Sequence, residues 1–171
     1  RGELKIIILV TSAKDRMLSS IVISKNEGDM IGDCLLSLKF SDETIIVDSG
    51  NTDATNEIAK SFGARIVSCK GGNFAEFRNT GLKAARKAWV LYVDADERVT
   101  PLLKNEIEQI TSSPDSAPVY QIPRKNIYLG KEMHFGGWGG DRVIRLFKKS
   151  ALQGYKGQLH EQPIFTGGLK T

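Results

Sequence analysis

The chain has 171 residues, of which 40% are hydrophobic and 26% are charged, and its formal net charge is +4. This length and composition suit one domain with a hydrophobic core, and they exclude a disordered or low-complexity chain. No apolar run approaches the roughly 18 residues that a membrane-spanning helix needs. Two cysteines, Cys34 and Cys69, have no metal-like spacing, so a disulfide framework is excluded and a reducing compartment is favoured.

Residues 1–16 do not follow the pattern of the rest of the chain. They contain a strand-like run at 4–10 and then a polar break, and Met17 opens the next apolar run. Two interpretations remain open for this segment: an extra N-terminal strand, or sequence that precedes a native start at Met17. Residues 17–171 are predicted to form a single domain.

From residue 19 onward, short apolar runs alternate with amphipathic stretches. The runs predict strands at 20–24, 44–48, 65–68 and 89–93, and the stretches between them predict helices over about 30–38, 53–62 and 73–85. A further helix is expected from Thr100-Pro101, and further strands at 119–123, 126–129 and 143–147. This alternation predicts an α/β fold with a mostly parallel central sheet and helices on both faces.

In such a sheet, ligands bind beyond the carboxyl ends of the strands. Three predicted strands end in polar or acidic residues: the first in Ser24-Lys25-Asn26-Glu27, the second in Asp48, and the fourth in Asp94-Ala95-Asp96. We therefore expect Ser24, Asn26, Glu27, Asp48 and Asp94 to line one crevice.

The sequence Asp94-Ala95-Asp96 is the strongest functional signal. In an extended chain, residues two apart lie about 6.6–6.8 Å from each other and point the same way, so both carboxylates could address one ligand complex. Two close carboxylates repel each other, and a divalent cation such as Mg²⁺ or Mn²⁺ removes that cost and can bridge a diphosphate. The alternative is an acidic turn that caps the helix near Thr100.

Asp48 and Arg78 are candidates for binding a nucleotide. Asp48 ends a predicted strand and could accept from a nucleobase N–H or a ribose hydroxyl. Arg78 lies in a predicted helix and could present its planar donor fork to a phosphate or a base. The alternatives are an ordinary turn residue and a surface arginine.

His160-Glu161 could supply a metal ligand beside a general base. Asp141 is a rival base, because it directly follows the glycine-rich stretch 136–140, which is predicted to be a mobile loop.

Taken together, these motifs resemble family 2 glycosyltransferases, and most of all the bacterial branch that includes lipopolysaccharide core β-1,4-glucosyltransferases. The resemblance covers about residues 18–165. It is carried by Ser-Ile-Val-Ile-Ser-Lys-Asn-Glu at 20–27, Ile-Val-Asp-Ser-Gly-Asn-Thr-Asp-Ala-Thr at 46–55, Arg-Asn-Thr-Gly at 78–81, Val-Asp-Ala-Asp-Glu at 93–97, Arg-Leu-Phe at 145–147 and His-Glu at 160–161.

The resemblance implies a GT-A-type, Rossmann-like fold and inverting sugar transfer from a nucleotide sugar with Mg²⁺ or Mn²⁺. It places Asp48 at the nucleobase, Arg78 near the nucleotide, and Asp94 near the ribose and the metal. It gives Asp96 to the metal and gives His160-Glu161 a contact with the metal or the diphosphate, with Glu161, ahead of Asp141, as the base. In this setting the glycine-rich loop would close over the donor, and Trp138 would stack on a sugar ring or anchor the loop. Members of this family usually continue well beyond the His-Glu motif, so we expect this chain to be truncated at its C-terminus.

The expected partners are a UDP-linked donor and a glycan or lipid-linked acceptor, with no nucleic acid. The expected location is the cytoplasm, with peripheral contact at the anionic inner face of the membrane, and the expected process is the synthesis of lipopolysaccharide or another cell-surface glycan. Two alternatives stay open, a non-catalytic nucleotide-sugar-binding fragment and a nucleotidyltransferase. The second lacks its glycine-rich first loop here.

Overall fold

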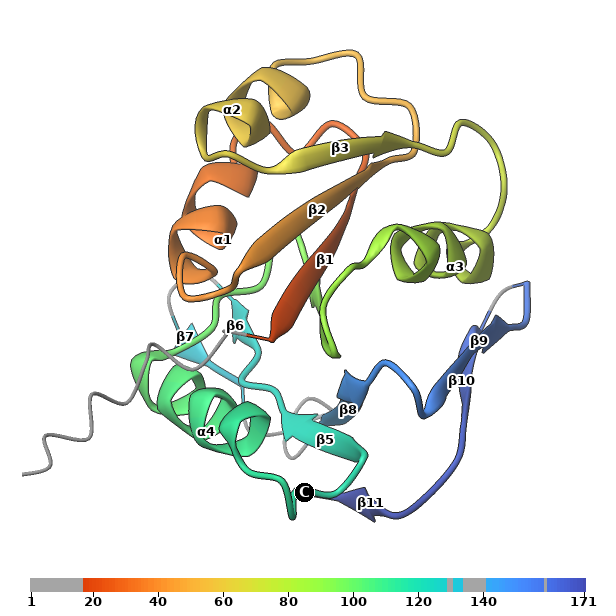
Figure 1. Ribbon diagram of the computed structural model, residues 1–171. Helices are drawn as coiled ribbons and strands as arrows, with labels where there is room; N and C mark the ends of the chain where they lie inside the picture. The colour runs from red at the N-terminus through yellow and green to blue at the C-terminus, as the bar shows by residue number, and fades with distance from the viewer. Residues whose placement is uncertain (1–16, 129–130, 134–140, 159) are drawn as a thin grey trace, which may run out of the picture.

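Figure 1 shows the computed structural model, which describes residues 17–128, 131–133, 141–158 and 160–171. The helices are α1 (Ile31–Ser37), α2 (Thr55–Ser61), α3 (Phe74–Ala84) and α4 (Pro101–Ser112). The strands are β1 (Leu18–Ser24), β2 (Glu43–Asp48), β3 (Arg65–Ser68), β4 (Trp89–Asp94), β5 (Val119–Pro123), β6 (Ile127–Tyr128), β7 (Lys131–Glu132), β8 (Arg142–Lys148), β9 (Leu152–Lys156), β10 (Gln162–Phe165) and β11 (Leu169–Lys170). The expectations for residues 1–16, for the glycine-rich stretch and for Trp138 lie outside the described residues.

Seven strands form the central sheet in the order β11-β5-β8-β4-β1-β2-β3. β4, β1, β2 and β3 pair in parallel, whereas β8 lies antiparallel between β4 and β5. The predicted mostly parallel sheet is therefore confirmed. In its register Ser24 lies opposite Asp48, and Ile23 lies opposite Asp94, so the ends of β1, β2 and β4 meet at one edge, called here the carboxyl edge.

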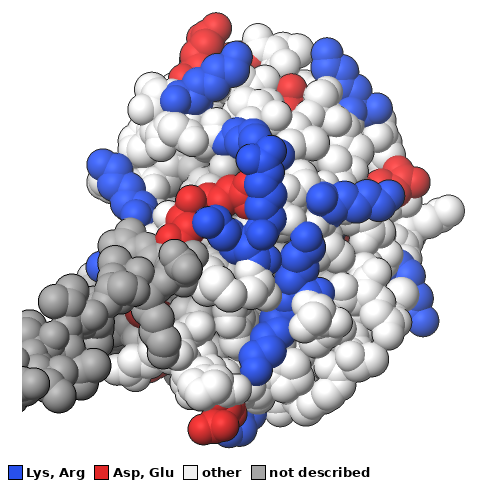
Figure 2. Space-filling view, viewed as in Figure 1, with Lys and Arg blue, Asp and Glu red and all other residues white. Residues whose placement is uncertain are grey.

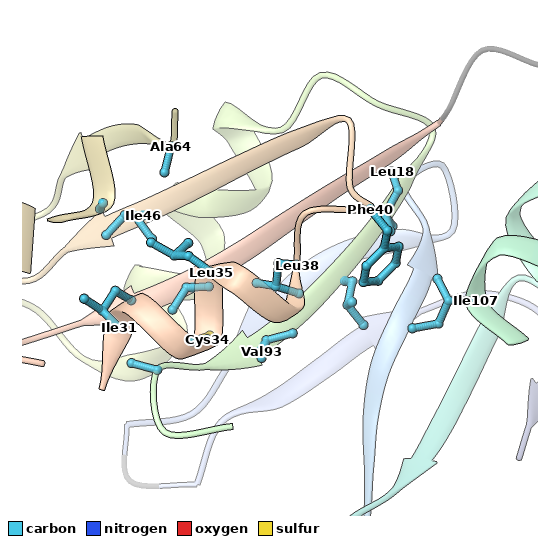
Figure 3. Packing of buried hydrophobic residues seen from close by; sticks show 14 of the residues in the cluster. Leu18, Ile31, Cys34, Leu35, Leu38, Phe40, Ile46, Ala64, Val93 and Ile107 are labelled. Carbon is cyan, nitrogen blue, oxygen red and sulfur yellow. The ribbon is translucent and has the colours of Figure 1, made fainter. Parts of the chain in front are cut away.

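Helices cover both faces of the sheet, as predicted (Figure 1). α1, α2 and α4 pack on one face, where Ile31, Leu35 and Ile107 join Val22 and Val93 in one buried cluster. Figure 3 shows this packing from close by. α3 packs on the other face together with β9. Residues of β1 belong to the buried clusters on both faces of the sheet, because successive strand residues point to opposite faces.

Capping residues explain where two helices begin. Asn73 and Glu76 form a capping box at the start of α3, and Thr100 caps α4 ahead of Pro101. Asp53 does not cap α2, because that helix begins at Thr55 after Ala54 and its cap has no side-chain hydrogen bond. Asp53 instead accepts from the backbone N–H groups of Thr55 and Gly28, and so ties two loops together.

The buried face of α3 includes a charged residue. Ala75, Arg78 and Leu82 are buried, whereas Phe74, one position before Ala75, is 54% exposed. One position on a helix turns a side chain by about 100°, which is enough to carry it from the core to solvent. This rotation is what buries Arg78.

Gly81 lets α3 approach the sheet closely. A Cβ atom at this position would lie well inside van der Waals contact with Ile21 Cγ2 and 3.2 Å from Val47 Cγ2. Gly81→Ala is therefore expected to lower the free energy of unfolding by about 1–3 kcal/mol in urea titrations. Gly32→Ala in α1 is the matched control, because its Cβ would have 3.8 Å to its nearest neighbour and the change is expected to stabilise by about 0.5–1 kcal/mol. Equal effects would contradict this account of the packing.

Glu43 joins the amino-terminal ends of several strands, at the edge opposite the carboxyl edge. Its carboxylate accepts from Ser19 Oγ at 2.6 Å, from Arg65 Nη2 at 2.7 Å and from the backbone N–H of Arg86 at 2.9 Å. Burial alone would raise the pKa of Glu43, but these hydrogen bonds outweigh it and hold the pKa below the ordinary value of 4.5.

A lowered pKa makes the stability that Glu43 contributes depend on pH. The contribution is fully present above pH 4.5 and is lost as the pH falls through the lower pKa of the folded state. Glu43→Gln is expected to cost about 1.5–3 kcal/mol of unfolding free energy at pH 7, with the difference from wild type shrinking below about pH 4. Denaturant titrations over a pH series test this, with exposed Glu106→Gln as the control. A difference that stays constant down to pH 2.5 would refute it.

Candidate active site

The loops that follow β1 and β2 are held together by side-chain hydrogen bonds. Asn51 Nδ2 donates to Ser24 Oγ at 2.9 Å, and Asn51 Oδ1 accepts from the backbone N–H of Asn26 at 2.7 Å. Asn26 has a φ of 58°, a left-handed conformation that asparagine tolerates, and its side chain accepts from Thr52. Glu27 donates its backbone N–H to Thr55 Oγ1. The predicted residues Ser24, Asn26 and Glu27 thus lie together at the carboxyl edge.

Asp48 lies beside these loops at the end of β2 and is buried. Its Oδ1 accepts from the backbone N–H groups of Gly50 at 2.8 Å and Asn51 at 2.6 Å, and its Oδ2 accepts from Asn56 Nδ2 at 3.0 Å. Burial by itself would raise the pKa of Asp48. The hydrogen bonds from Asn51, Asn56 and Gly50 together have the larger, opposite effect, so the pKa of Asp48 lies below its usual range. Asp48 is therefore an ionised acceptor, and Oδ2 retains lone-pair capacity for another donor.

The acidic segment after β4 is a turn and not an extended chain. The backbone N–H of Glu97 donates to Asp94 O at 2.9 Å, and Glu97 Oε2 accepts from the backbone N–H of Asp94 at 2.9 Å. The spacing that we expected between Asp94 and Asp96 assumed an extended strand, and that premise is wrong because the strand ends at Asp94. Asp94 is half-buried. Asp96 is exposed and has neither an ion pair nor a hydrogen bond with any residue that the structure describes.

The acids around this turn alternate with arginines in one chain of ion pairs. Arg145 binds both oxygens of Asp94, with Nη1 3.0 Å from Oδ1 and Nη2 in contact with Oδ2, and Nη2 is also 3.3 Å from Glu97 Oε1. Arg78 lies on the other side, 3.6 Å from Asp94 Oδ1 and 2.9 Å from Glu161 Oε1. The sequence of contacts is Glu161–Arg78–Asp94–Arg145–Glu97–Arg124–Asp141.

This chain of ion pairs contains two buried arginines, Arg78 and Arg145, whose side chains are only 9% and 8% exposed. Burial raises the pKa of Asp94, but the hydrogen bond from Arg145 and the positive charges of Arg145 and Arg78 lower it more, so that its pKa lies below the usual range. The Arg78 guanidinium also lies 5.3 Å from the centre of the Tyr92 ring and 5.5 Å from that of Tyr155. Asp94 is accordingly a fixed anion, not a group that exchanges protons near neutral pH.

Each of the two predicted bases lies at one end of the chain of ion pairs. Glu161 is half-buried and binds Arg78 through Oε1, and its Oε2 has no partner among the described residues. Asp141 binds Arg124 through Oδ2. His160 is exposed.

The described residues contain no group of three or more His, Cys, Asp or Glu side chains that could hold a metal ion. The predicted set of Asp94, Asp96 and His160 is therefore not gathered into a cage. Both oxygens of Asp94 are already occupied by Arg145, and Asp96 is the one carboxylate of this turn with no described partner.

Sequence reasoning missed the roles of Arg145 and Arg124. Arg145 was noticed only as part of Arg-Leu-Phe, yet it interrupts an otherwise apolar strand, Val143-Ile-Arg-Leu-Phe147. A charged residue inside a buried strand needs a counter-ion, and this signal could have pointed to Asp94. Arg124 gave no comparable signal, because its partner Asp141 is 17 residues away across β5 and β8.

Comparison with known proteins decides the family. Residues 19–168 match the family model described as glycosyl transferase family 2. This chain belongs to glycosyl transferase family 2. The match covers most of the chain and confirms the resemblance seen in the sequence, and it goes against the nucleotidyltransferase alternative.

Individual relatives agree with the family assignment. An uncharacterised glycosyltransferase of Rickettsia typhi is 32% identical over 137 residues, which are 78% of this chain and 47% of that protein. The lipopolysaccharide core biosynthesis glycosyltransferase LpsC of Rhizobium meliloti is 27% identical over 66% of this chain and 44% of its own length. The chain thus spans less than half the length of these curated relatives.

A solved structure supports the fold. Glucosyl-3-phosphoglycerate synthase of Mycobacterium tuberculosis superposes with a TM-score of 0.52 at 23% identity, over 62% of this chain and 43% of that one. The predicted GT-A-type, Rossmann-like α/β fold is therefore confirmed.

Proposed function

We propose that this chain carries the donor-binding and catalytic half of an inverting glycosyltransferase that moves a sugar from a nucleotide-sugar donor to a hydroxyl acceptor. The observation that carries the proposal is the carboxyl edge of the sheet, where Asp48, the turn at Asp94 and Asp96, and Glu161 lie in a chain of the glycosyltransferase family. In open α/β sheets this edge is where ligands bind.

The loops after β1 and β2 are proposed to bind the nucleoside. They are fixed by the Asn51 and Asn26 hydrogen bonds before any ligand arrives, which reduces the ordering cost of binding. Asp48 would accept from a nucleobase N–H through Oδ2, with Ser24, Asn26 and Glu27 beside it. The M. tuberculosis synthase was crystallised with Mn²⁺ and UDP, and we propose a UDP-linked donor here.

A divalent cation fits the turn if Asp96 is its main protein ligand. Mg²⁺ is commonly held by one or two carboxylates together with substrate phosphates, so a single free carboxylate is chemically sufficient. When bound, Mg²⁺ or Mn²⁺ would neutralise charge on the departing diphosphate. Asp94 would contact the ribose at the rim of this site. His160 remains a predicted ligand, and its place outside any cluster makes Asp96 the stronger candidate.

Glu161 is proposed as the base. Its free Oε2 would take the proton of the acceptor hydroxyl, whose oxygen then forms a bond to the anomeric carbon on the face opposite the nucleotide. The bond from that carbon to the diphosphate oxygen breaks, and its electron pair leaves with the nucleoside diphosphate. Arg78 holds Glu161 through Oε1 and fixes the direction of the other oxygen. Asp141 is the second choice, because its Oδ2 accepts two hydrogen bonds from Arg124.

Titration calorimetry with UDP, with and without Mn²⁺, followed by an assay of UDP release from a panel of UDP-sugars, tests this function. We expect binding that requires Mn²⁺ and a turnover that requires an acceptor. Binding without any turnover, in this chain and in a protein of the relatives' full length, would favour the non-catalytic binding module. A failure to bind any nucleoside diphosphate would contradict both.

The acceptor class is proposed from the relative LpsC, whose name places it in lipopolysaccharide core synthesis. A glycan or lipid-linked acceptor in cell-surface glycan synthesis, reached from the cytoplasm without contact to nucleic acid, is consistent with this relative. None of the described helices has the length and hydropathy to cross a membrane.

The amino-terminal edge of the sheet is the candidate surface for contact with an anionic membrane face. Figure 2 shows a band of Lys and Arg side chains across the middle of the face in view. A hollow of about 580 Å³ at the amino edge is lined by Lys39, Arg65, Arg86 and Lys87 and also by the acidic residues Asp42 and Glu43. Arg65 donates to Ala84 O at the end of α3, so Lys39, Arg86 and Lys87 are the cations more available to a partner.

Sedimentation with vesicles tests this contact. Each cation near an anionic membrane contributes about 1 kcal/mol, so Arg86→Gln/Lys87→Gln is expected to reduce binding to phosphatidylglycerol vesicles by about 30-fold. Lys104→Gln/Lys131→Gln removes the same charge from other parts of the surface and should have less than a threefold effect. Equal losses in the two double variants would show that net charge, and not this edge, attracts the membrane.

A further inference from the structure

Arg145 forms an ion pair with Asp94, a carboxylate that was expected to bind the divalent cation. It contacts both oxygens of Asp94 and one oxygen of Glu97, so that a single guanidinium spans two of the three acids in the turn after β4. Its own side chain is 8% exposed. This contact accounts for the absence of a metal cage among the described acidic residues.

The sheet holds Arg145 in place. β8 lies beside β4 in antiparallel register, with Leu146 opposite Leu91, and the residues that flank Arg145 in β8 pack in the core. The guanidinium therefore belongs to a residue of a buried strand, and its side chain does not extend freely from the surface. Moving it away would break both of its contacts with Asp94 and leave that carboxylate with Arg78 alone, 3.6 Å from Oδ1, which is costly for a pair in this setting.

Asp96 is in the opposite situation. It is exposed and has no described partner, although only one residue separates it from Asp94. A lone exposed carboxylate binds Mg²⁺ or Mn²⁺ weakly, because affinity for these cations rises with the number of charged oxygen ligands. A nucleoside diphosphate would supply the missing anionic oxygens.

We propose that Arg145 is a positioning residue that acts as the resident counter-ion of Asp94 and thereby makes binding of the divalent cation depend on the nucleotide. Arg145 withholds Asp94 and Glu97 from the cation, and Asp96 completes a site only together with a diphosphate. This inference rests on the proposed function. It adds to that function an order of assembly, in which the cation is retained when it arrives with the donor.

Electron paramagnetic resonance of Mn²⁺ measures cation binding in the whole chain without reference to activity. Wild type is expected to bind Mn²⁺ at least tenfold more tightly with UDP than without it. Arg145→Met removes both close contacts to the Asp94 carboxylate and leaves only Arg78, 3.6 Å from Oδ1, while Glu97 keeps Arg124. The variant should therefore bind Mn²⁺ without UDP at least tenfold more tightly than wild type does, and UDP should then improve binding less than threefold. Arg124→Gln removes a different arginine of the same chain of ion pairs and should stay within twofold of wild type.

A second variant keeps the test decisive if Arg145→Met does not fold. Arg145→Lys keeps the positive charge but can contact only one Asp94 oxygen well, and it should tighten Mn²⁺ binding without UDP about threefold. A purely structural role for Arg145 predicts unchanged or weaker Mn²⁺ binding in both variants, and that result would overturn the inference alone. Wild type that binds UDP but no Mn²⁺ would overturn the metal assignment of the proposed function, and the inference with it.

Discussion

Asp96→Asn is expected to lower kcat for sugar transfer about 10³-fold while leaving the fold intact. A cation at a leaving diphosphate contributes several kcal/mol of transition-state stabilisation, and each 1.36 kcal/mol corresponds to about tenfold in rate. Asp96 is exposed and has neither a hydrogen bond nor an ion pair with the described residues, so its replacement breaks no such interaction. Steady-state assays over a range of Mn²⁺ concentrations measure the effect.

Two matched variants separate the role of Asp96 from the general effect of lost charge. Asp115→Asn removes one exposed carboxylate from the connector after α4 and should leave kcat within twofold. Asp96→Glu retains a carboxylate on a longer stem and should recover part of the activity at high Mn²⁺. If Asp96→Asn kept a tenth or more of the wild-type kcat, Asp96 would not be the main ligand.

Glu161→Gln is expected to reduce kcat by about 10²–10⁴-fold without weakening donor binding. General base catalysis contributes this range, and glutamine keeps the size of the side chain and an acceptor for Arg78 but cannot take a proton. The measurement is kcat for transfer together with the Kd for UDP in the presence of Mn²⁺, and the Kd should stay within threefold of wild type.

Asp141→Asn is the internal comparison for the base. It lies at the other end of the same chain of ion pairs and is held by Arg124. Its loss should reduce kcat less than tenfold if Glu161 is the base. The opposite ranking of the two variants would transfer the role to Asp141.

The parallel part of the fold could be predicted from the sequence because local signals agree there. β1 and β2 contain β-branched apolar runs, and β4 is an apolar run that ends in Asp94. The sequence also contains the capping box of Asn73 and Glu76 at the start of α3. The C-terminal hairpin of β9 and β10 was not predicted. β9 contains Gly154 at a φ of 144°, and β10 contains Pro163, so neither strand has a regular strand pattern.

The positions of the site residues could be predicted, but their contacts could not. The carboxyl edge follows from strand order alone, which is why Asp48 and Asp94 lie where expected. The pairing of Arg78 with Glu161 joins residues 83 positions apart, and that of Arg145 with Asp94 joins residues 51 apart. Contacts at such separations depend on the packing of α3 and β8, which no local pattern specifies.

The metal site at Asp96 is tested most directly by a crystal of this chain with UDP and Mn²⁺, in which the cation is located by its anomalous scattering. We expect one Mn²⁺ bonded to an Asp96 carboxylate oxygen and to the diphosphate, with Arg145 still bound to Asp94. A cation bound away from the turn after β4, or UDP seated at the carboxyl edge with no cation beside Asp96, would contradict it.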